Sequence, residues 1–279
     1  MKTFFVYGTA VGGENFTGRE AETARLKANF ENGINTLLIS PRRMGKTSLV
    51  QKVKAIVNGK KIAVVYLDMF DCRSEYDFYN KLVTAVLEQT ASRKETIFQN
   101  IKGFPGRLSP RISFSPDPSM DFSFSLGITA KDYSPEEVLG LAERIAQKQE
   151  RHIVICIDEF QQVGKFPESV PVQKRMRGVW QLQKNVSYCL FGSKKHLMTN
   201  IFQSKSMPFY QFGDAIYPGT IPVEKWVPLI CKKFGEKGVS ITKKNEHVAR
   251  HCKRDSSQFH VKRGHGKVSA RNKVQYCSH

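Results

Sequence analysis

Two short, almost wholly apolar segments restrict the possible folds of this chain most strongly. Residues 62–67 read IAVVYL and residues 152–157 read HIVICI, and both are rich in β-branched side chains. A strand with apolar side chains on both sides must be covered on both faces of its sheet, which is typical of parallel sheets. Shorter runs at 36–40, 187–191 and 215–217 predict further strands of the same kind.

Segments with helical periodicity separate these strands. They lie at 19–31, 46–57, 75–88 and 135–150. Strands that alternate with helices of this length predict an α/β fold in which helices cover a mostly parallel sheet. Thr17, with Glu20 three residues later, is expected to cap the first helix.

Residues 103–133 differ from this pattern, because four prolines punctuate them. Within the segment, residues 111–115 and 121–126 alternate polar and apolar side chains. This alternation predicts a β-hairpin that is inserted into the α/β domain and laid on its surface.

The loop after the first strand has the composition of a phosphate-binding site. Residues 36–50 read TLLISPRRMGKTSLV, with Ser40 where the usual pattern has its first glycine. Backbone N–H groups at such a loop and helix N-terminus attract anions. Lys46 would reach the β- and γ-phosphates of ATP, and Thr47 would place its hydroxyl on Mg²⁺. The expected binding residues are Ser40, Pro41, Arg42, Arg43, Met44, Gly45, Lys46, Thr47 and Ser48.

Polar residues also end the two strands further along the chain. Asp158 and Glu159 follow the strand at 152–157, and Ser193 follows the strand at 187–191. In P-loop ATPases an Asp at this place holds the Mg²⁺ shell, and an adjacent Glu can deprotonate the attacking water. Ser193 would face the γ-phosphate. Two solvated carboxylates and an ordinary turn serine are the alternatives. The predicted catalytic residues are Lys46, Glu159 and Ser193, and the predicted metal ligands are Thr47 and Asp158.

Four stretches together resemble a known family. F-T-G-R-E at 16–20, S-P-R-R-M-G-K-T-S-L at 40–49, C-I-D-E-F-Q at 156–161 and F-G-S at 191–193 look like the prokaryotic "archaeal ATPase" family, which is allied to the STAND and AAA+ P-loop ATPases. Ser or Gly before P-R-R-x-G-K-T is usual in it. The resemblance covers about residues 4–250. It implies a three-layer P-loop fold in which another strand separates the Walker B strand from the phosphate-loop strand.

The resemblance also implies ATP with Mg²⁺ and a C-terminal helical lid. Thr17, Gly18 and Arg19 would lie near the base and ribose, through an N-terminal loop. Arg175 and Arg177 would be candidates for contacting a phosphate of this or a neighbouring subunit, with a solvated basic helix face as the alternative. We expect an ATPase domain over 1–222 and a partial lid over 223–250.

The last residues, 251–279, depart from the family. They hold seven Lys and Arg, one Asp and eight apolar residues, none of which is Leu, Ile or Met. So little apolar surface does not support independent folding. We expect a disordered basic tail, such as a frameshift or truncation of a longer parent would produce.

Composition restricts the function classes further. The net charge of +19 admits DNA as a partner. The chain has no apolar run long enough to span a membrane, and its six cysteines form no C-x-x-C pair, so we expect a cytoplasmic protein. The favoured function is an ATP-hydrolysing, nucleotide-dependent switch that acts on an effector or as a homo-oligomer. The alternatives are an ATP-licensed DNA-binding protein of the origin-initiator kind and a nucleotide-binding relic without turnover.

Overall fold

The computed structural model describes residues 9–91, 110–113, 123–126 and 134–236. The chain divides into two compact units, one formed by Arg19–Gly219 and the other by Met1–Gly18 together with Thr220–His279. The larger unit holds the sheet and the loop of residues 40–48, the predicted phosphate-binding loop.

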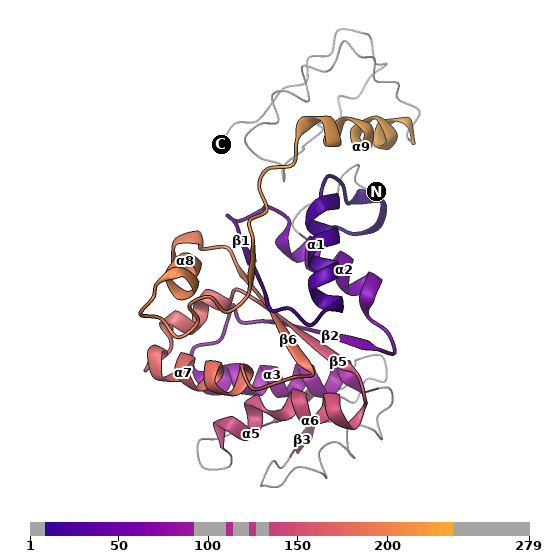
Figure 1. Ribbon diagram of the computed structural model, residues 1–279. Coiled ribbons are helices and arrows are strands. Elements are labelled where there is room, and N and C mark those ends of the chain that lie inside the picture. Colours follow the sequence, from indigo (N-terminus) through magenta and orange to yellow (C-terminus); the bar gives the residue numbers. More distant parts are fainter. Residues whose placement is uncertain (1–8, 92–109, 114–122, 127–133, 237–279) are drawn as a thin grey trace. The chain divides into compact units, whose positions relative to one another are not determined.

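A five-stranded parallel sheet is the centre of the larger unit (Figure 1). Its strands are β1 (Thr36–Ile39), β2 (Ile62–Asp68), β5 (His152–Asp158), β6 (Val186–Gly192) and β7 (Asp214–Ile216). Their order is β2-β5-β6-β1-β7, so β6 lies between the phosphate-loop strand β1 and the carboxylate strand β5. All five predicted strands are confirmed, and so is the additional strand that the resemblance implied.

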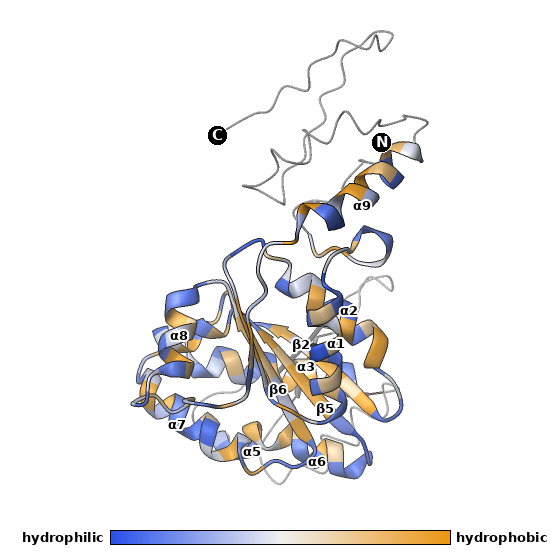
Figure 2. Ribbon diagram, turned by 45° about the horizontal axis from the view of Figure 1, so that its top comes forward, coloured by the Kyte–Doolittle hydropathy of each residue, from blue (hydrophilic) through white to orange (hydrophobic). Residues whose placement is uncertain are grey.

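Helices cover both faces of this sheet, which confirms the three-layer α/β fold. They are α1 (Glu20–Glu31), α2 (Lys46–Val57), α3 (Glu75–Thr90), α5 (Pro135–Leu139), α6 (Leu141–Lys148), α7 (Ser169–Trp180) and α8 (Lys195–Gln203). Because side chains alternate along a strand, Leu37 and Ile39 of β1 join the core under α3 and α5–α8, while Leu38 faces α1 and α2. In Figure 2 the strands are orange over most of their length, as a sheet buried on both faces requires.

A cluster of aromatic side chains anchors the segment that follows β5. This segment is the 3₁₀-helix η2 (Phe160–Lys165). The fully buried ring of Phe160 lies 5.4 Å from Phe209 and 5.7 Å from Phe202, measured between ring centroids. Trp180 and Tyr188 stack beside them with centroids 3.9 Å apart. The start of η2 is therefore fixed by the core rather than by solvent-exposed contacts.

Several helix boundaries differ from the sequence predictions. The capping box at Thr17 is wrong, because α1 begins at Glu20 and the Thr17 hydroxyl donates to the carbonyl of Lys225 instead. The predicted helix at 135–150 is two helices that meet at Gly140, whose ψ of −6° departs from the value of about −42° that is typical of an α-helix. Helix α8 follows Ser193, where the sequence analysis predicts no helix.

The inserted segment contains two short paired strands. β3 (Pro110–Ser113) and β4 (Ser123–Leu126) pair antiparallel, with Ile112 opposite Phe124. The rest of 103–133 lies outside the described residues.

The smaller unit contains η1 (Gly13–Asn15) and α9 (Val223–Gly235). Lys232 of α9 forms an ion pair with Glu14, with the nitrogen 3.1 Å from the carboxylate oxygen. The remainder of the predicted lid, 237–250, and the predicted tail, 251–279, lie outside the described residues. None of the described helices is long and apolar enough to cross a bilayer.

Candidate functional site

The loop between β1 and α2 has the backbone conformation of an anion-binding turn. Arg43 and Gly45 both have positive φ, at +64° and +74°. A positive φ is uncommon for a residue other than glycine, and left-handed residues in a tight turn gather backbone N–H groups into a concavity. Pro41, Arg42, Arg43 and Gly45 are exposed, while Ser40, Lys46 and Ser48 are buried. The loop therefore presents its backbone to solvent at the N-terminus of α2.

Lys46 places its ammonium group inside this loop. Its Nζ donates to the carbonyls of Ser40 and Pro41, at 2.9 and 2.8 Å. Burial lowers the pKa of the Lys46 ammonium, and the charges of Asp158 and Glu159 oppose that shift. A cation in such a partly desolvated place interacts strongly with any anion that enters the loop.

Arg19 supports the loop from the other side. Its buried guanidinium donates to the carbonyl of Met44 at 3.0 Å and to that of Gly219, and it forms an ion pair with Glu22 at 2.7 Å. The hydrogen bond to Met44 holds the backbone of the loop at residues 40–48. The sequence pattern did not indicate this structural role for Arg19.

Gly18 belongs to the smaller unit and has φ of +70°. A Cβ at this position would lie 2.3 Å from Cγ2 of Ile221, so packing within that unit requires glycine there.

Asp158, at the end of β5, collects three hydrogen bonds. Thr47 Oγ1 donates to its Oδ2 at 2.9 Å, the Tyr66 hydroxyl donates to the same oxygen at 3.0 Å, and the backbone N–H of Glu159 donates to Oδ1 at 2.8 Å. Burial raises the pKa of the Asp158 carboxyl, and the three hydrogen bonds lower it in part. Burial and the Asp158 charge raise the pKa of the Tyr66 phenol, which therefore stays a hydrogen-bond donor.

Tyr66 is a residue that sequence reasoning missed. It reads as one more apolar position of IAVVYL, and only the parallel pairing of β2 with β5, in which Tyr66 lies opposite Cys156, brings its hydroxyl to the carboxylate.

Glu159 is joined to the two neighbouring loops through its side chain. Its Oε2 accepts from the Ser193 hydroxyl at 3.2 Å and from the Gln161 amide. The Ser193 oxygen in turn accepts from Nε of Arg42, also at 3.2 Å. The structure thus brings together Arg42 after β1, Glu159 after β5 and Ser193 after β6. They meet because the carboxyl ends of these parallel strands lie at the same edge of the sheet. Gln161 was not among the predicted site residues.

The two arginines of α7 lie elsewhere. Arg175 forms an ion pair with Glu75 at 2.7 Å, and the guanidinium of Arg177 lies 4.8 Å from the centroid of the Phe212 ring. Both therefore make contacts within their own unit, and neither is recorded in contact with the phosphate loop among the described residues.

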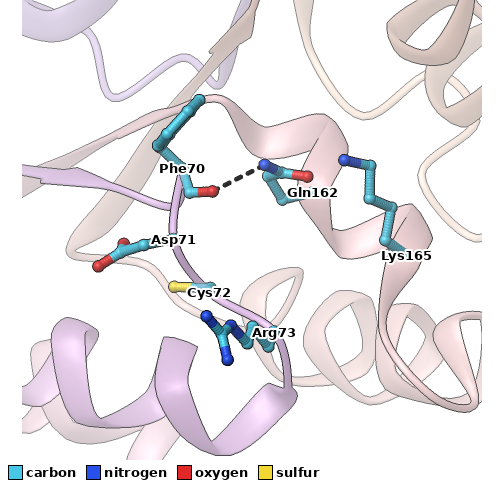
Figure 3. A pocket seen from close by; sticks show the side chains of 6 residues that line it. All are labelled: Phe70, Asp71, Cys72, Arg73, Gln162 and Lys165. Carbon is cyan, nitrogen blue, oxygen red and sulfur yellow. Dashed lines mark hydrogen bonds between the residues drawn. The ribbon is translucent and has the colours of Figure 1, made fainter.

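A pocket of about 510 Å³ lies where η2 faces the loop after β2. Figure 3 shows the Gln162 side chain reaching across to this loop, where its Nε2 donates to the carbonyl of Phe70 at 2.8 Å. Arg73, Lys165 and the exposed ring of Phe70 also line the pocket. The hydrogen bond joins the ends of β2 and β5 next to Asp158.

The candidate metal site offers oxygen donors, which are the ligands that Mg²⁺ takes in proteins. No group of three or more His, Cys, Asp or Glu side chains that could hold a metal gathers within the described residues. Mg²⁺ takes one or two protein oxygens and completes its shell with water and phosphate oxygens. The Thr47 hydroxyl and the Asp158 carboxylate, already in contact, supply such a pair.

Solved structures with this fold are known. The chain superposes on a Walker-type ATPase of Pyrococcus abyssi with a TM-score of 0.63 and 16% identity, covering 91% of this chain and 68% of that one. It also superposes, with a TM-score of 0.52 in each case, on the Orc1 protein of Aeropyrum pernix in complex with DNA and on the ADP form of the Orc2 protein of the same organism. The identities there are 15% and 13%, and the coverage is 87% and 89% of this chain but only 56% and 60% of theirs.

These identities are low, so the likeness shows the fold alone. No family model matches the sequence, and no curated protein matches it either.

Proposed function

We propose that this protein binds ATP with Mg²⁺, hydrolyses it, and uses the nucleotide state as a switch. The observation that carries the proposal is the 2.9 Å hydrogen bond between Thr47 Oγ1 and Asp158 Oδ2. It joins the start of α2 to the end of β5, the two segments that serve one metal–triphosphate centre in P-loop ATPases.

Each residue of the site has a defined task in this proposal. The loop residues 40–48 cradle the phosphates, and Lys46 neutralises charge on the β- and γ-phosphates. Thr47 and Asp158 hold Mg²⁺, which supplies electrostatic stabilisation when it is bound. Ser193 would face the γ-phosphate as its sensor, with Arg42 in contact with this serine.

Glu159 is assigned as the general base. The water oxygen forms a bond to the γ-phosphorus while the bond from phosphorus to the bridging oxygen breaks, and that electron pair leaves on ADP. The water proton passes to the Glu159 carboxylate.

The test is ATP turnover by the whole chain, with and without duplex DNA. We expect Mg²⁺-dependent release of phosphate in the absence of DNA. A protein that binds ATP but releases no phosphate under either condition would be the relic, and hydrolysis would be excluded.

DNA binding is the second candidate function, and the net charge of +19 favours it. An ATP-licensed DNA-binding protein would bind DNA only with ATP, and its affinity would fall steeply as salt rises, because each neutralised phosphate releases a counterion. Binding that is absent or independent of nucleotide would leave the switch as the better description.

Tyr66→Phe should weaken the affinity of the ATP-bound protein for Mg²⁺ by about 10-fold, because hydrogen bonds to a ligating carboxylate orient it and tune its basicity. Titration of Mg²⁺ into the ATP complex measures the effect. Tyr79→Phe is the matched control, since its hydroxyl also donates to a carboxylate, that of Glu75, but away from the loop. Equal Mg²⁺ affinity in both variants would contradict the role of Tyr66 in orienting the Asp158 carboxylate as a metal ligand.

A further inference from the structure

Gln161 is a buried polar side chain next to the proposed base. It is 1% exposed, and its Nε2 donates to Oε2 of Glu159. Its own Oε1 has no hydrogen-bond partner among the described residues. Leaving a buried carbonyl without a donor lowers the stability of the folded state, so the hydrogen bond from Nε2 to Glu159 is the favourable polar contact that this side chain makes.

The backbone around Gln161 is held from two sides. Phe160, the preceding residue, is locked in the aromatic cluster. Gln162, the following residue, donates its backbone N–H to the carbonyl of Glu159 at 2.9 Å and its side-chain amide to Phe70 (Figure 3). Because both neighbours are fixed, the backbone of Gln161 is fixed as well, and with it the bond from Cα to Cβ at which the side chain begins.

The end of β6 leaves room for the Gln161 amide. A Cβ at Gly192 would lie 1.8 Å from Oε1 of Gln161 and 3.0 Å from the sulfur of Met198. A side chain at Gly192 would therefore require the end of the Gln161 side chain to move. In the sequence F-G-S at 191–193, Ser193 donates a hydrogen bond to Glu159. Gly192 leaves the space that the Gln161 amide, the second donor to Glu159, occupies.

The two donors converge on one oxygen of Glu159. Both Gln161 Nε2 and Ser193 Oγ donate to Oε2, whereas no donor to Oε1 is recorded in the described part of the chain. The terminal torsion of a glutamate side chain has a broad, roughly two-fold preference, so a carboxylate without such contacts samples many orientations. Two donors on one oxygen leave the other oxygen in a defined place to accept a proton.

We propose that Gln161 is a positioning residue, which orients Glu159 so that Oε1 receives the proton of the attacking water. This inference rests on the proposed ATP hydrolysis and adds to it a residue that acts only through Glu159. It also accounts for the glycine at position 192, because the amide of Gln161 occupies the space that a side chain at this position would need.

The decisive variant is Gln161→Met, which keeps the length of the side chain but removes the donor. We expect kcat for ATP to fall by about 10- to 100-fold, the scale on which small misplacements of reacting groups act, while KM changes little. The melting temperature should stay the same or rise, because the unpartnered carbonyl is removed. A purely structural role would instead lower the melting temperature.

Gln173→Met is the matched control. Gln173 is also fully buried, its Nε2 donates to Ser169 at 2.9 Å, and its Oε1 likewise has no partner among the described residues, but it lies on α7. We expect this variant to hydrolyse ATP at the wild-type kcat.

Gly192→Ala tests the same contact from the other side. It should lower kcat as Gln161→Met does, and the double variant should be little worse than either single one, since both remove one interaction. If Gln161→Met does not fold, Gly192→Ala decides alone.

Two failures can be told apart. Absence of hydrolysis by the unaltered protein would overturn the proposed function itself. Wild-type kcat in Gln161→Met or Gly192→Ala, with active unaltered protein, would overturn only the positioning role, as would a fall in kcat that is accompanied by a lower melting temperature in Gln161→Met.

Discussion

Glu159→Gln should retain ATP binding and slow hydrolysis by roughly 10²–10⁴-fold, the usual contribution of a general base. The amide preserves the shape of the side chain but cannot accept the proton of water. Single-turnover hydrolysis, with ATP affinity measured in parallel, separates the chemical step from binding.

Glu168→Gln provides the control for this prediction. Glu168 has the same φ of +52° as Glu159 but is exposed at the start of α7, so its substitution should leave the rate unchanged. If Glu159→Gln hydrolyses ATP as fast as the unaltered protein in a single turnover, another group is the base.

Lys46→Ala should abolish tight ATP binding. The triphosphate loses its only lysine partner inside the loop, in a partly desolvated place where a charge interacts more strongly than in water. An ATP titration by calorimetry or by displacement of a fluorescent analogue measures the loss directly.

Lys54→Ala tests whether such a loss is specific. Lys54 lies two turns further along α2, burial also lowers the pKa of its ammonium, and its Nζ donates to Gln89 at 2.7 Å. Its removal should leave ATP affinity unchanged, whatever it does to stability. Unchanged ATP affinity in Lys46→Ala would instead remove the assignment of the phosphate loop.

Local sequence predicted the larger part of the fold and the framework of the site. An apolar run rich in β-branched residues favours a strand that is covered on both faces of a parallel sheet. The strands could therefore be recognised from short segments such as 62–67 and 152–157, whose residues are mostly buried. Polar residues at the ends of parallel strands meet at one edge, which is why Thr47, Asp158, Glu159 and Ser193 could be expected together. Each of these inferences needs only neighbouring residues and the direction of the chain.

The helices without strong local signals could not be read in this way. Helix α8 and the division of the predicted helix at Gly140 depend on how these segments pack on the sheet. The Thr17 hydroxyl donates a hydrogen bond to the carbonyl of Lys225, 208 residues away, rather than capping the adjacent helix. Tertiary contacts of this kind override local propensity because each one adds a hydrogen bond or buried area that the isolated segment does not have.

What the sequence by itself determined is the order of the strands, the helices with strong periodicity, the loop at 40–48 and the pair of carboxylates. What only the tertiary structure decided is which other side chains serve them. Tyr66 reaches Asp158 through strand register, Arg19 reaches the carbonyl of Met44 through the packing of α1, and Gln161 reaches Glu159 because Gly192 leaves space for it. The periodicity of apolar residues indicates which side of a helix or strand is buried. A contact between residues that are distant in the sequence depends instead on the register and spacing of whole elements, and a local sequence pattern does not indicate these.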